Sequence, residues 1–150
     1  MSVIPTILLV EDDDGHAFLI EDNLRRGGVT APILRFSDGQ EVLDFLFRRT
    51  TEPRFVPGDA YLLSLDIQMP GVDGVETLRQ IKADAELRSL PVIMLTTTDD
   101  SREVQRCHDL GCNNYVIKPV TFDHFATTIS KLGQFISMLE LPLISSAQEA

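Results

Sequence analysis

Acidic side chains stand at two places in the sequence from which they could act together. Glu11 and Asp12 open a run of four acidic residues that follows the apolar segment 7–10, and Asp66 ends the strand expected around the apolar segment 61–63. Carboxylates that are held together raise one another's pKa and stay ionised only if a cation joins them. Oxygen ligands of this kind suit Mg²⁺. The residue types therefore predict a magnesium site where the two places meet.

Two further side chains could complete a site for phosphoryl transfer. The hydroxyl of Thr96 and the ammonium of Lys118 each follow another short apolar segment. The three carboxylates and Lys118 together carry a charge of about −2, which one Mg²⁺ would cancel. Asp66 could then act as a nucleophile and form an acyl phosphate, while the metal and Lys118 neutralise charge on the transferring group. Thr96 could hydrogen-bond the new phosphate and draw its loop inward, which would make a switch.

The elements that must position these residues follow from the hydropathy pattern. Short apolar segments alternate with segments of helical period. Each short apolar segment is typical of a strand buried on both faces. The alternation predicts an α/β fold in which helices cover both faces of a parallel sheet. Ligands of such sheets bind at the carboxyl ends of the strands, where the candidate residues stand. Asp14 and Asp38 are placed to cap the first and second helices. The apolar segments are 7–10, 33–34, 61–63, 92–95 and 115–117.

Composition excludes several classes of function. The chain has 150 residues, with 23 acidic against 13 basic side chains and a net charge of −10. Such a balance disfavours nucleic acid and anionic membranes as partners. No apolar run approaches the roughly 18 residues of a membrane span, and the amino end does not resemble a signal peptide. We therefore expect a cytoplasmic protein, whose Cys107 and Cys112 are free thiols packed near a helix end.

In combination, these motifs resemble the receiver domain of two-component response regulators. The similarity runs from Ile7 to about Leu139 and includes the Glu11-Asp12 pair, the segment LDIQMPGVDG around Asp66, Thr96 and the segment YVIKP. The resemblance implies a flavodoxin-like (βα)5 fold with a five-stranded parallel sheet in the order 2-1-3-4-5. It also implies one receiver domain over 1–140, followed by a short tail over 141–150 and no output domain.

The resemblance implies a role for each chemical residue. Asp66 matches the phosphoacceptor, which takes a phosphoryl group from a phosphohistidine of a histidine kinase. Lys118 matches the amine that pairs with the phosphate, and the Lys118-Pro119 bond is expected to be cis. Thr96 and Tyr115 match the switch pair that changes the face made by the fourth helix, fifth strand and fifth helix.

A metal site is implied as well. Asp12 and Asp66 match direct ligands of Mg²⁺, and Glu11 matches the acid that holds the ion through water. Gln68 matches the residue that lends a backbone carbonyl. Asp13 lies one position beyond the acidic pair and is not expected to be a ligand.

A proline-containing stretch over 48–60 is longer than the usual connection between the second helix and the third strand. It should enter the amino end of that strand, away from the chemistry. With the missing output domain, it makes the chain similar to small stand-alone receivers paired with bacterial phytochrome histidine kinases. The expected partner is thus a sensor histidine kinase, with a bacteriophytochrome as the candidate, docked at the first helix. His16 is expected to be a surface residue of that docking face, and His108 and His124 to face solvent.

The last predicted helix supplies a candidate interface. Phe135 and Met138 fall off its core-facing stripe, near an apolar tail. Surplus apolar surface of this kind favours an interaction site. Since receivers commonly pair through this region, we expect a homodimer that uses Phe135, Met138 and the tail.

Two other functions remain open from the sequence. A Mg²⁺-dependent phosphatase of the haloacid dehalogenase type also uses an Asp nucleophile, but it places that residue after the first strand in a D-x-D-x-T pattern, which the run beginning at Glu11 does not fit. A degenerate receiver could act as a constitutive interaction module. The presence of Asp66, Asp12, Thr96 and Lys118 argues against it.

Overall fold

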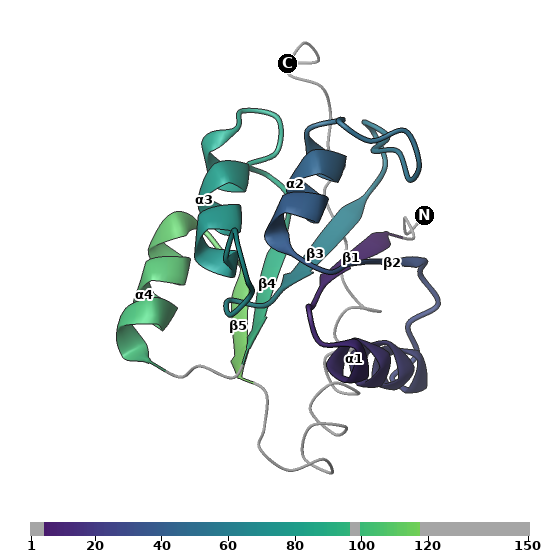
Figure 1. Cartoon of the computed structure of the whole chain (residues 1–150), viewed down its shortest axis with the longest axis horizontal. Helices are drawn as coiled ribbons and strands as arrows, with labels where there is room; N and C mark the ends of the chain where they lie inside the picture. Colours follow the sequence, from purple (N-terminus) through teal and green to yellow (C-terminus); the bar gives the residue numbers. More distant parts are fainter. Residues whose placement is uncertain (1–4, 97–99, 118–150) are drawn as a thin grey trace.

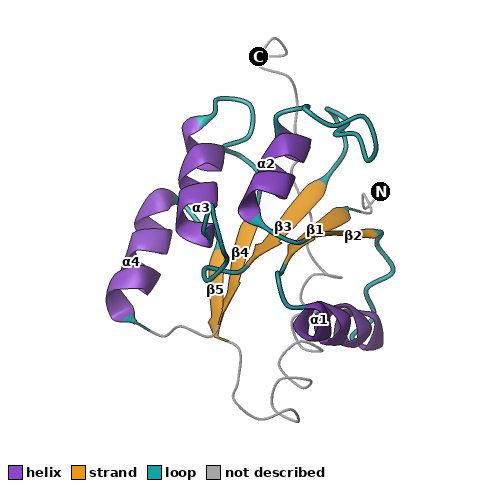
Figure 2. Cartoon of the chain, viewed as in Figure 1, coloured by secondary structure: helices purple, strands orange, loops and turns teal. Residues whose placement is uncertain are grey.

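The structure is a computed structural model and describes residues 5–96 and 100–117. Strands and helices alternate along this part of the chain, as Figure 2 shows. The strands are β1 (Thr6–Val10), β2 (Ile33–Phe36), β3 (Tyr61–Leu65), β4 (Val92–Thr96) and β5 (Asn114–Ile117). The helices are α1 (Asp14–Arg26), α2 (Gly39–Leu46), α3 (Gly74–Ala83) and α4 (Ser101–Leu110). The fifth helix, Lys118, the Lys118-Pro119 bond, His124, Phe135 and Met138 lie outside the described residues.

The strands form one parallel sheet in the order β2-β1-β3-β4-β5. The predicted α/β class and the predicted strand order are thus confirmed. The order reverses between β1 and β3, whose register pairs Val10 with Leu65. The residues that follow, Glu11 and Asp66, therefore leave the sheet side by side, and the Asp66 amide donates to the Val10 carbonyl at 3.3 Å.

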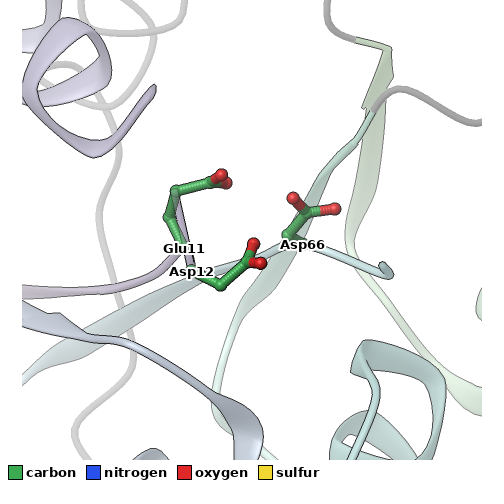
Figure 3. Close-up of side chains that lie close together, drawn as sticks. All are labelled: Glu11, Asp12 and Asp66. Atoms are coloured by element: carbon green, nitrogen blue, oxygen red, sulfur yellow. The ribbon is translucent and has the colours of Figure 1, made fainter. Parts of the chain in front are cut away.

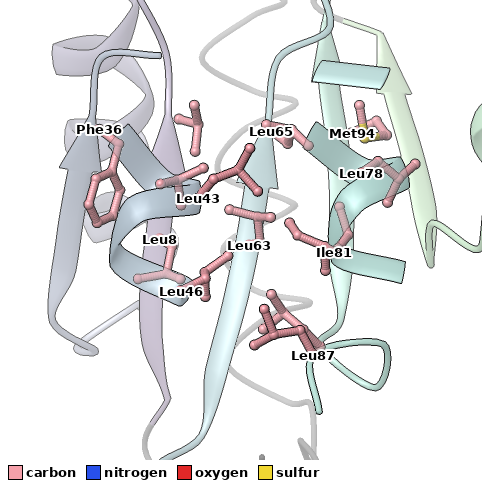
Figure 4. Close-up of a cluster of buried hydrophobic side chains, with 14 of the residues drawn as sticks. Leu8, Phe36, Leu43, Leu46, Leu63, Leu65, Leu78, Ile81, Leu87 and Met94 are labelled. Atoms are coloured by element: carbon pink, nitrogen blue, oxygen red, sulfur yellow. The ribbon is translucent and has the colours of Figure 1, made fainter. Parts of the chain in front are cut away.

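Helices cover both faces of the sheet because strand side chains alternate between the faces. Leu8 and Leu63 point into a cluster with residues of α2 and α3 (Figure 4). Cys107 of α4 belongs to the same cluster. Ile7 and Leu62 point the other way, into a second cluster that includes residues of α1. Figure 1 shows the result, with α1 on one side of the sheet and the other described helices on the opposite side.

The apolar segments are buried to different degrees. All residues of β3 and β4 are buried, as expected for strands covered on both faces. In β2 only Phe36 is buried, and in β5 Ile117 is exposed. The prediction of two-sided burial is thus wrong for these two strands. They stand at the edges of the sheet, where one flank has no neighbouring strand among the described residues.

Helix α1 is capped by Asp13, so the prediction of Asp14 as its cap is wrong. Asp13 has extended backbone angles, and its side chain accepts a hydrogen bond from the His16 amide at 2.8 Å. Asp14 is the first residue of the helix itself and lies in its first turn. The predicted cap of α2 is confirmed, because Asp38 accepts from the Glu41 amide at 2.8 Å.

The long connection between α2 and β3 is anchored by aromatic contacts. The Phe55 ring stacks on Tyr61 with centroids 5.0 Å apart and meets the Phe45 ring edge-on at 5.9 Å. The Arg48 guanidinium lies over the Phe55 ring at 5.5 Å. Since Tyr61 begins β3 and Asp66 follows its other end, the connection enters the strand at the end opposite the acidic residues, as predicted.

Candidate functional site

Three carboxylates gather at the carboxyl edge of the sheet. Glu11 and Asp12 lie in the loop between β1 and α1, and Asp66 follows β3. One oxygen from each lies within 4.8 Å of the others, and Figure 3 shows the carboxyl groups around a common space. No other group of three or more His, Cys, Asp or Glu residues within the described ranges is arranged to hold a metal ion. The convergence expected from the strand ends is therefore present.

The three acids differ in exposure. Glu11 is 1% exposed and Asp66 6%, whereas Asp12 is exposed. Burying carboxylates beside one another costs free energy unless hydrogen bonds or a cation compensate. Part of that compensation is visible: the Gln68 amide donates to Asp66 Oδ1 at 3.2 Å, and His16 Nδ1 lies 3.5 Å from Glu11 Oε1. Exposed Asp12 leaves the cluster a side that faces solvent.

The donor set suits a hard divalent cation. All three candidate ligands are carboxylates, and Mg²⁺ binds oxygen at about 2.1 Å in octahedral geometry. Two oxygens on opposite sides of such an ion are about 4.2 Å apart, close to the 4.8 Å limit that encloses this cluster. Small side-chain rotations, or one bridging water, would let all three acids reach a single ion. The residues present therefore fit Mg²⁺.

The chain turns back sharply after Asp66. Gly71 has φ +74°, a left-handed conformation that favours glycine. The Gly74 amide then donates to the Ile67 carbonyl at 2.9 Å, which closes the loop against its own start. Gln68 lies inside this loop with an exposed side chain. Its backbone amide reaches Asp66, and the assignment of its carbonyl as a metal ligand stays a prediction.

Two residues that contact the acidic loop were not identified as such from the sequence. The sequence predicts His16 only as a surface residue, and it is exposed, yet its ring approaches Glu11. The sequence does not predict a role for Arg35, although its guanidinium donates to the Glu11 carbonyl and to the Asp14 side chain. The register of β2 against β1 brings Arg35 to this edge, and a lone arginine in an apolar segment gives no signal of it.

The predicted switch residues lie on the next two strands. Thr96 ends β4 and is fully buried, and β4 is the neighbour of β3. Tyr115 lies on β5, where it pairs with Met94. Burial raises the pKa of Tyr115 to about 12, with smaller contributions from nearby acidic groups that include Asp66. Lys118, the remaining predicted site residue, follows the last described strand and is not itself described.

The cysteines take no part in this site. Cys107 and Cys112 are free and buried at the carboxyl end of α4, as predicted. Burial raises the pKa of Cys107 to about 11, so the thiolate is disfavoured at neutral pH. His108 is exposed, as predicted, with its Nδ1 3.8 Å from the Cys112 sulfur. No helix in the described part of the chain is long and apolar enough to cross a membrane.

Solved structures place this geometry among known proteins. A response regulator receiver domain from Rhodospirillum rubrum superposes with a TM-score of 0.88 at 45% identity, covering 94% of this chain and 99% of that one. The Mn²⁺-bound form of response regulator Rcp1 gives a TM-score of 0.84 at 27% identity, covering 92% and 99%. The phosphorylated cyanobacterial phytochrome response regulator RcpA gives 0.82 at 28% identity, covering 92% and 98%.

A family model agrees with these structural similarities. The model of the response regulator receiver domain matches residues 7–130, a range that contains the described sheet from Ile7 onward and all three clustered carboxylates. Receiver domains of this family act as phosphoacceptor modules in signalling. With the strand order, the acidic cluster and the family match in agreement, the chain belongs to the family of response regulator receiver domains.

Proposed function

We propose that this protein is a response regulator receiver that accepts a phosphoryl group from a histidine kinase on Asp66. The observation that carries the proposal is the position of Asp66 at the end of β3, with its carboxylate beside those of Glu11 and Asp12. The similarity to RcpA, solved in its phosphorylated form, supports the choice of chemistry. The similarity to Rcp1, solved with Mn²⁺, supports a divalent cation at the acidic cluster.

The proposed transfer is a single displacement at phosphorus. An oxygen of Asp66 attacks the phosphorus of a phosphohistidine, and the P–N bond breaks as the O–P bond forms. The electron pair of the broken bond returns to the imidazole, which takes up a proton. The product is an acyl phosphate on Asp66 and a free histidine on the kinase.

Charge makes a cation necessary for this reaction. The incoming group brings further negative charge to a place that already holds three carboxylates. Mg²⁺, when bound there, would neutralise charge on the oxygens of the transferring group. Glu11, Asp12 and Asp66 would hold the ion, together with the backbone carbonyl of Gln68. Lys118 would pair with the phosphate.

The signal is proposed to leave the site through Thr96 and Tyr115. Thr96 ends the strand next to the one that carries Asp66, so its hydroxyl is a candidate partner for a phosphate on that residue. If Thr96 moves toward the phosphate, space opens for the Tyr115 ring on the adjacent strand. The face formed by α4 and β5 would change with it, and the fifth helix would share in the change. Output is therefore proposed to occur through altered protein contacts.

The proposed partner is a sensor histidine kinase of the phytochrome class. RcpA is a phytochrome response regulator, and its structure covers nearly the same length as this chain.

We also propose that residues 1–140 form the receiver, with 141–150 as a tail, and that the protein is a homodimer through Phe135 and Met138. Sedimentation of Phe135→Asp tests the dimer: loss of the dimer is expected, and an unchanged mass would rule this interface out.

One experiment separates this proposal from the two other functions. The protein is incubated with acetyl phosphate and Mg²⁺ and its intact mass is measured. A receiver gains a single adduct of about 80 Da, the mass of one phosphoryl group, and Asp66→Asn gains none. A phosphatase would instead turn over a generic aryl phosphate ester without a lasting adduct. A constitutive interaction module would do neither.

A further inference from the structure

Arg35 joins the edge strand β2 to the acidic loop that follows β1. Its Nε and Nη2 atoms donate to the Glu11 carbonyl at 3.2 and 2.9 Å. Its Nη1 atom donates to Asp14 Oδ1 at 2.6 Å. The side chain is 29% exposed, while that of Asp14 is 91% exposed. One guanidinium thus binds the first and the last residue of the acidic run.

The strand register explains why Arg35 can reach this loop. Leu9 pairs with Arg35 and Val10 with Phe36, and the Glu11 amide donates to the Phe36 carbonyl at 3.0 Å. Glu11 is therefore fixed to the end of β2 by its amide and, through Arg35, by its carbonyl. These bonds hold the backbone amide and the backbone carbonyl of Glu11, the two groups on either side of the Cα atom that carries its side chain.

Asp12 and Asp13 lie between the two points that Arg35 holds. Asp13 is committed to capping α1 through the His16 amide. The remaining residue, Asp12, carries the exposed carboxylate of the cluster, and the chain on either side of it is fixed. The planar guanidinium offers several donors in a rigid fork, so it can hold two acceptors at a set separation.

We propose that Arg35 is a positioning residue for the metal ligands Glu11 and Asp12. The inference rests on the proposed function, since it concerns the divalent cation that the acidic cluster would hold. An octahedral cation such as Mg²⁺ tolerates little variation in ligand position. Groups that orient ligands from outside the coordination sphere typically change metal affinity by about 10- to 100-fold when they are removed. Arg35 contacts the backbone and the flank of the ligand loop in this way.

The charge of Arg35 alone would have the opposite effect. A guanidinium beside a cation site repels the incoming ion, so its removal would strengthen binding if charge dominated. Positioning predicts weaker binding after removal. The sign of the change in affinity therefore separates the two roles.

The test measures Mn²⁺ binding to the full chain by the electron paramagnetic resonance signal of the free ion. Arg35→Ala should raise the dissociation constant about tenfold. The dissociation constant of Arg35→Lys should lie between those of wild type and Arg35→Ala, because an ammonium keeps the charge but cannot hold both acceptors as the guanidinium does. The matched control is Arg26→Ala, which removes another arginine–aspartate pair, at the far end of α1. It should bind Mn²⁺ as wild type does.

Asp12→Asn shows whether the acidic cluster is the site, and circular dichroism shows that each variant is folded. If wild type binds Mn²⁺, Asp12→Asn weakens binding and Arg35→Ala binds as tightly as wild type or more so, the positioning role is overturned and the proposed site stands. If Arg35→Ala does not fold, Arg35→Lys decides by the same criterion. If wild type does not bind, or Asp12→Asn binds equally well, the metal site itself is overturned.

Discussion

Gly74 packs so closely on the main chain of Asp66 that a Cβ atom at position 74 would lie 2.0 Å from the Asp66 carbonyl oxygen. The first turn of α3 is thereby pressed against the residue proposed to accept the phosphoryl group. Since the obstacle is backbone rather than a flexible side chain, it cannot move away without shifting Asp66. The closeness of this contact couples the position of Asp66 to that of α3.

Replacing Gly74 with alanine should therefore destabilise the protein. We expect a loss of about 1–3 kcal/mol in the free energy of unfolding, the usual range for overpacking. Urea denaturation measures it. Gly15→Ala is the control, because Gly15 also stands in a first helical turn but its added Cβ would meet only the Asp13 side chain at 3.2 Å. That atom of Asp13 is the Oδ1 that caps α1, so the gain in helix propensity is partly offset and Gly15→Ala should lose clearly less stability than Gly74→Ala. An equal loss in both would contradict the argument.

Substitutions of the neighbouring residues Asp12 and Asp13 should affect the Mg²⁺ dependence of phosphorylation differently. Asp12→Asn should raise the Mg²⁺ concentration needed for half-maximal labelling by acetyl phosphate at least tenfold, because it removes a charged ligand. Asp13→Asn should leave that concentration unchanged, since asparagine caps a helix as well as aspartate does. The measurement is the initial rate of adduct formation across a Mg²⁺ titration. Equal shifts in the two variants would place the metal elsewhere in the loop.

The capping of α1 gives a second test within the same acidic run. Asp13→Ala should cost about 1 kcal/mol in the free energy of unfolding, because the His16 amide loses its partner. Asp14→Ala should cost about 0–1 kcal/mol, since the Asp14–Arg35 ion pair is largely solvated on the aspartate side. Thermal or urea unfolding compares the two, and a larger loss in Asp14→Ala would reverse the assignment of the cap.

Alkaline pH should weaken the fold in part through Cys107. Burial raises the pKa of this thiol from 9.0 to about 11. The unfolded chain therefore ionises first, so the contribution to stability is complete below pH 9 and is lost as pH rises from 9 to 11. The free energy of unfolding of wild type should fall between pH 9 and 11, and Cys107→Ala should remove up to about 2 kcal/mol of that fall.

The control for that experiment is Leu110→Ala on the same helix, a partly buried side chain packed against the same cluster as Cys107, which loses apolar contact without losing a titratable group. Its free energy of unfolding should be lowered at all pH values and should keep the slope of wild type. Parallel curves for wild type and Cys107→Ala between pH 8 and 11 would contradict the role assigned to this thiol.

The sequence predicted the sheet and the acidic cluster for the same reason. Apolar strand segments are recognisable without knowledge of their partners, and the residues at their carboxyl ends meet in a parallel sheet whatever the details of packing. Glu11, Asp12 and Asp66 could thus be grouped before any geometry was known. Their spacing within 4.8 Å bears this out.

Features that depend on a single backbone angle or on strand register could not be obtained in this way. Asp13 and Asp14 are chemically identical neighbours, and only the extended backbone of Asp13 (φ −89°, ψ 119°) decides which of them caps α1. Arg35 reaches Glu11 across 24 positions of sequence, through the register of β2 against β1. Exposure of Ile117 likewise follows from the edge position of β5 rather than from composition.

The position of the phosphoryl group tests the central claim most directly. Borohydride reduces an acyl phosphate to an alcohol with release of phosphate, so that a phosphorylated aspartate becomes homoserine. After labelling with acetyl phosphate and Mg²⁺ and treatment with borohydride, peptide mass spectrometry should find homoserine at position 66 and aspartate at positions 12 and 13. Homoserine at Asp12 or at another acid, or an adduct that survives borohydride unchanged, would contradict the assignment of Asp66 as the phosphoacceptor.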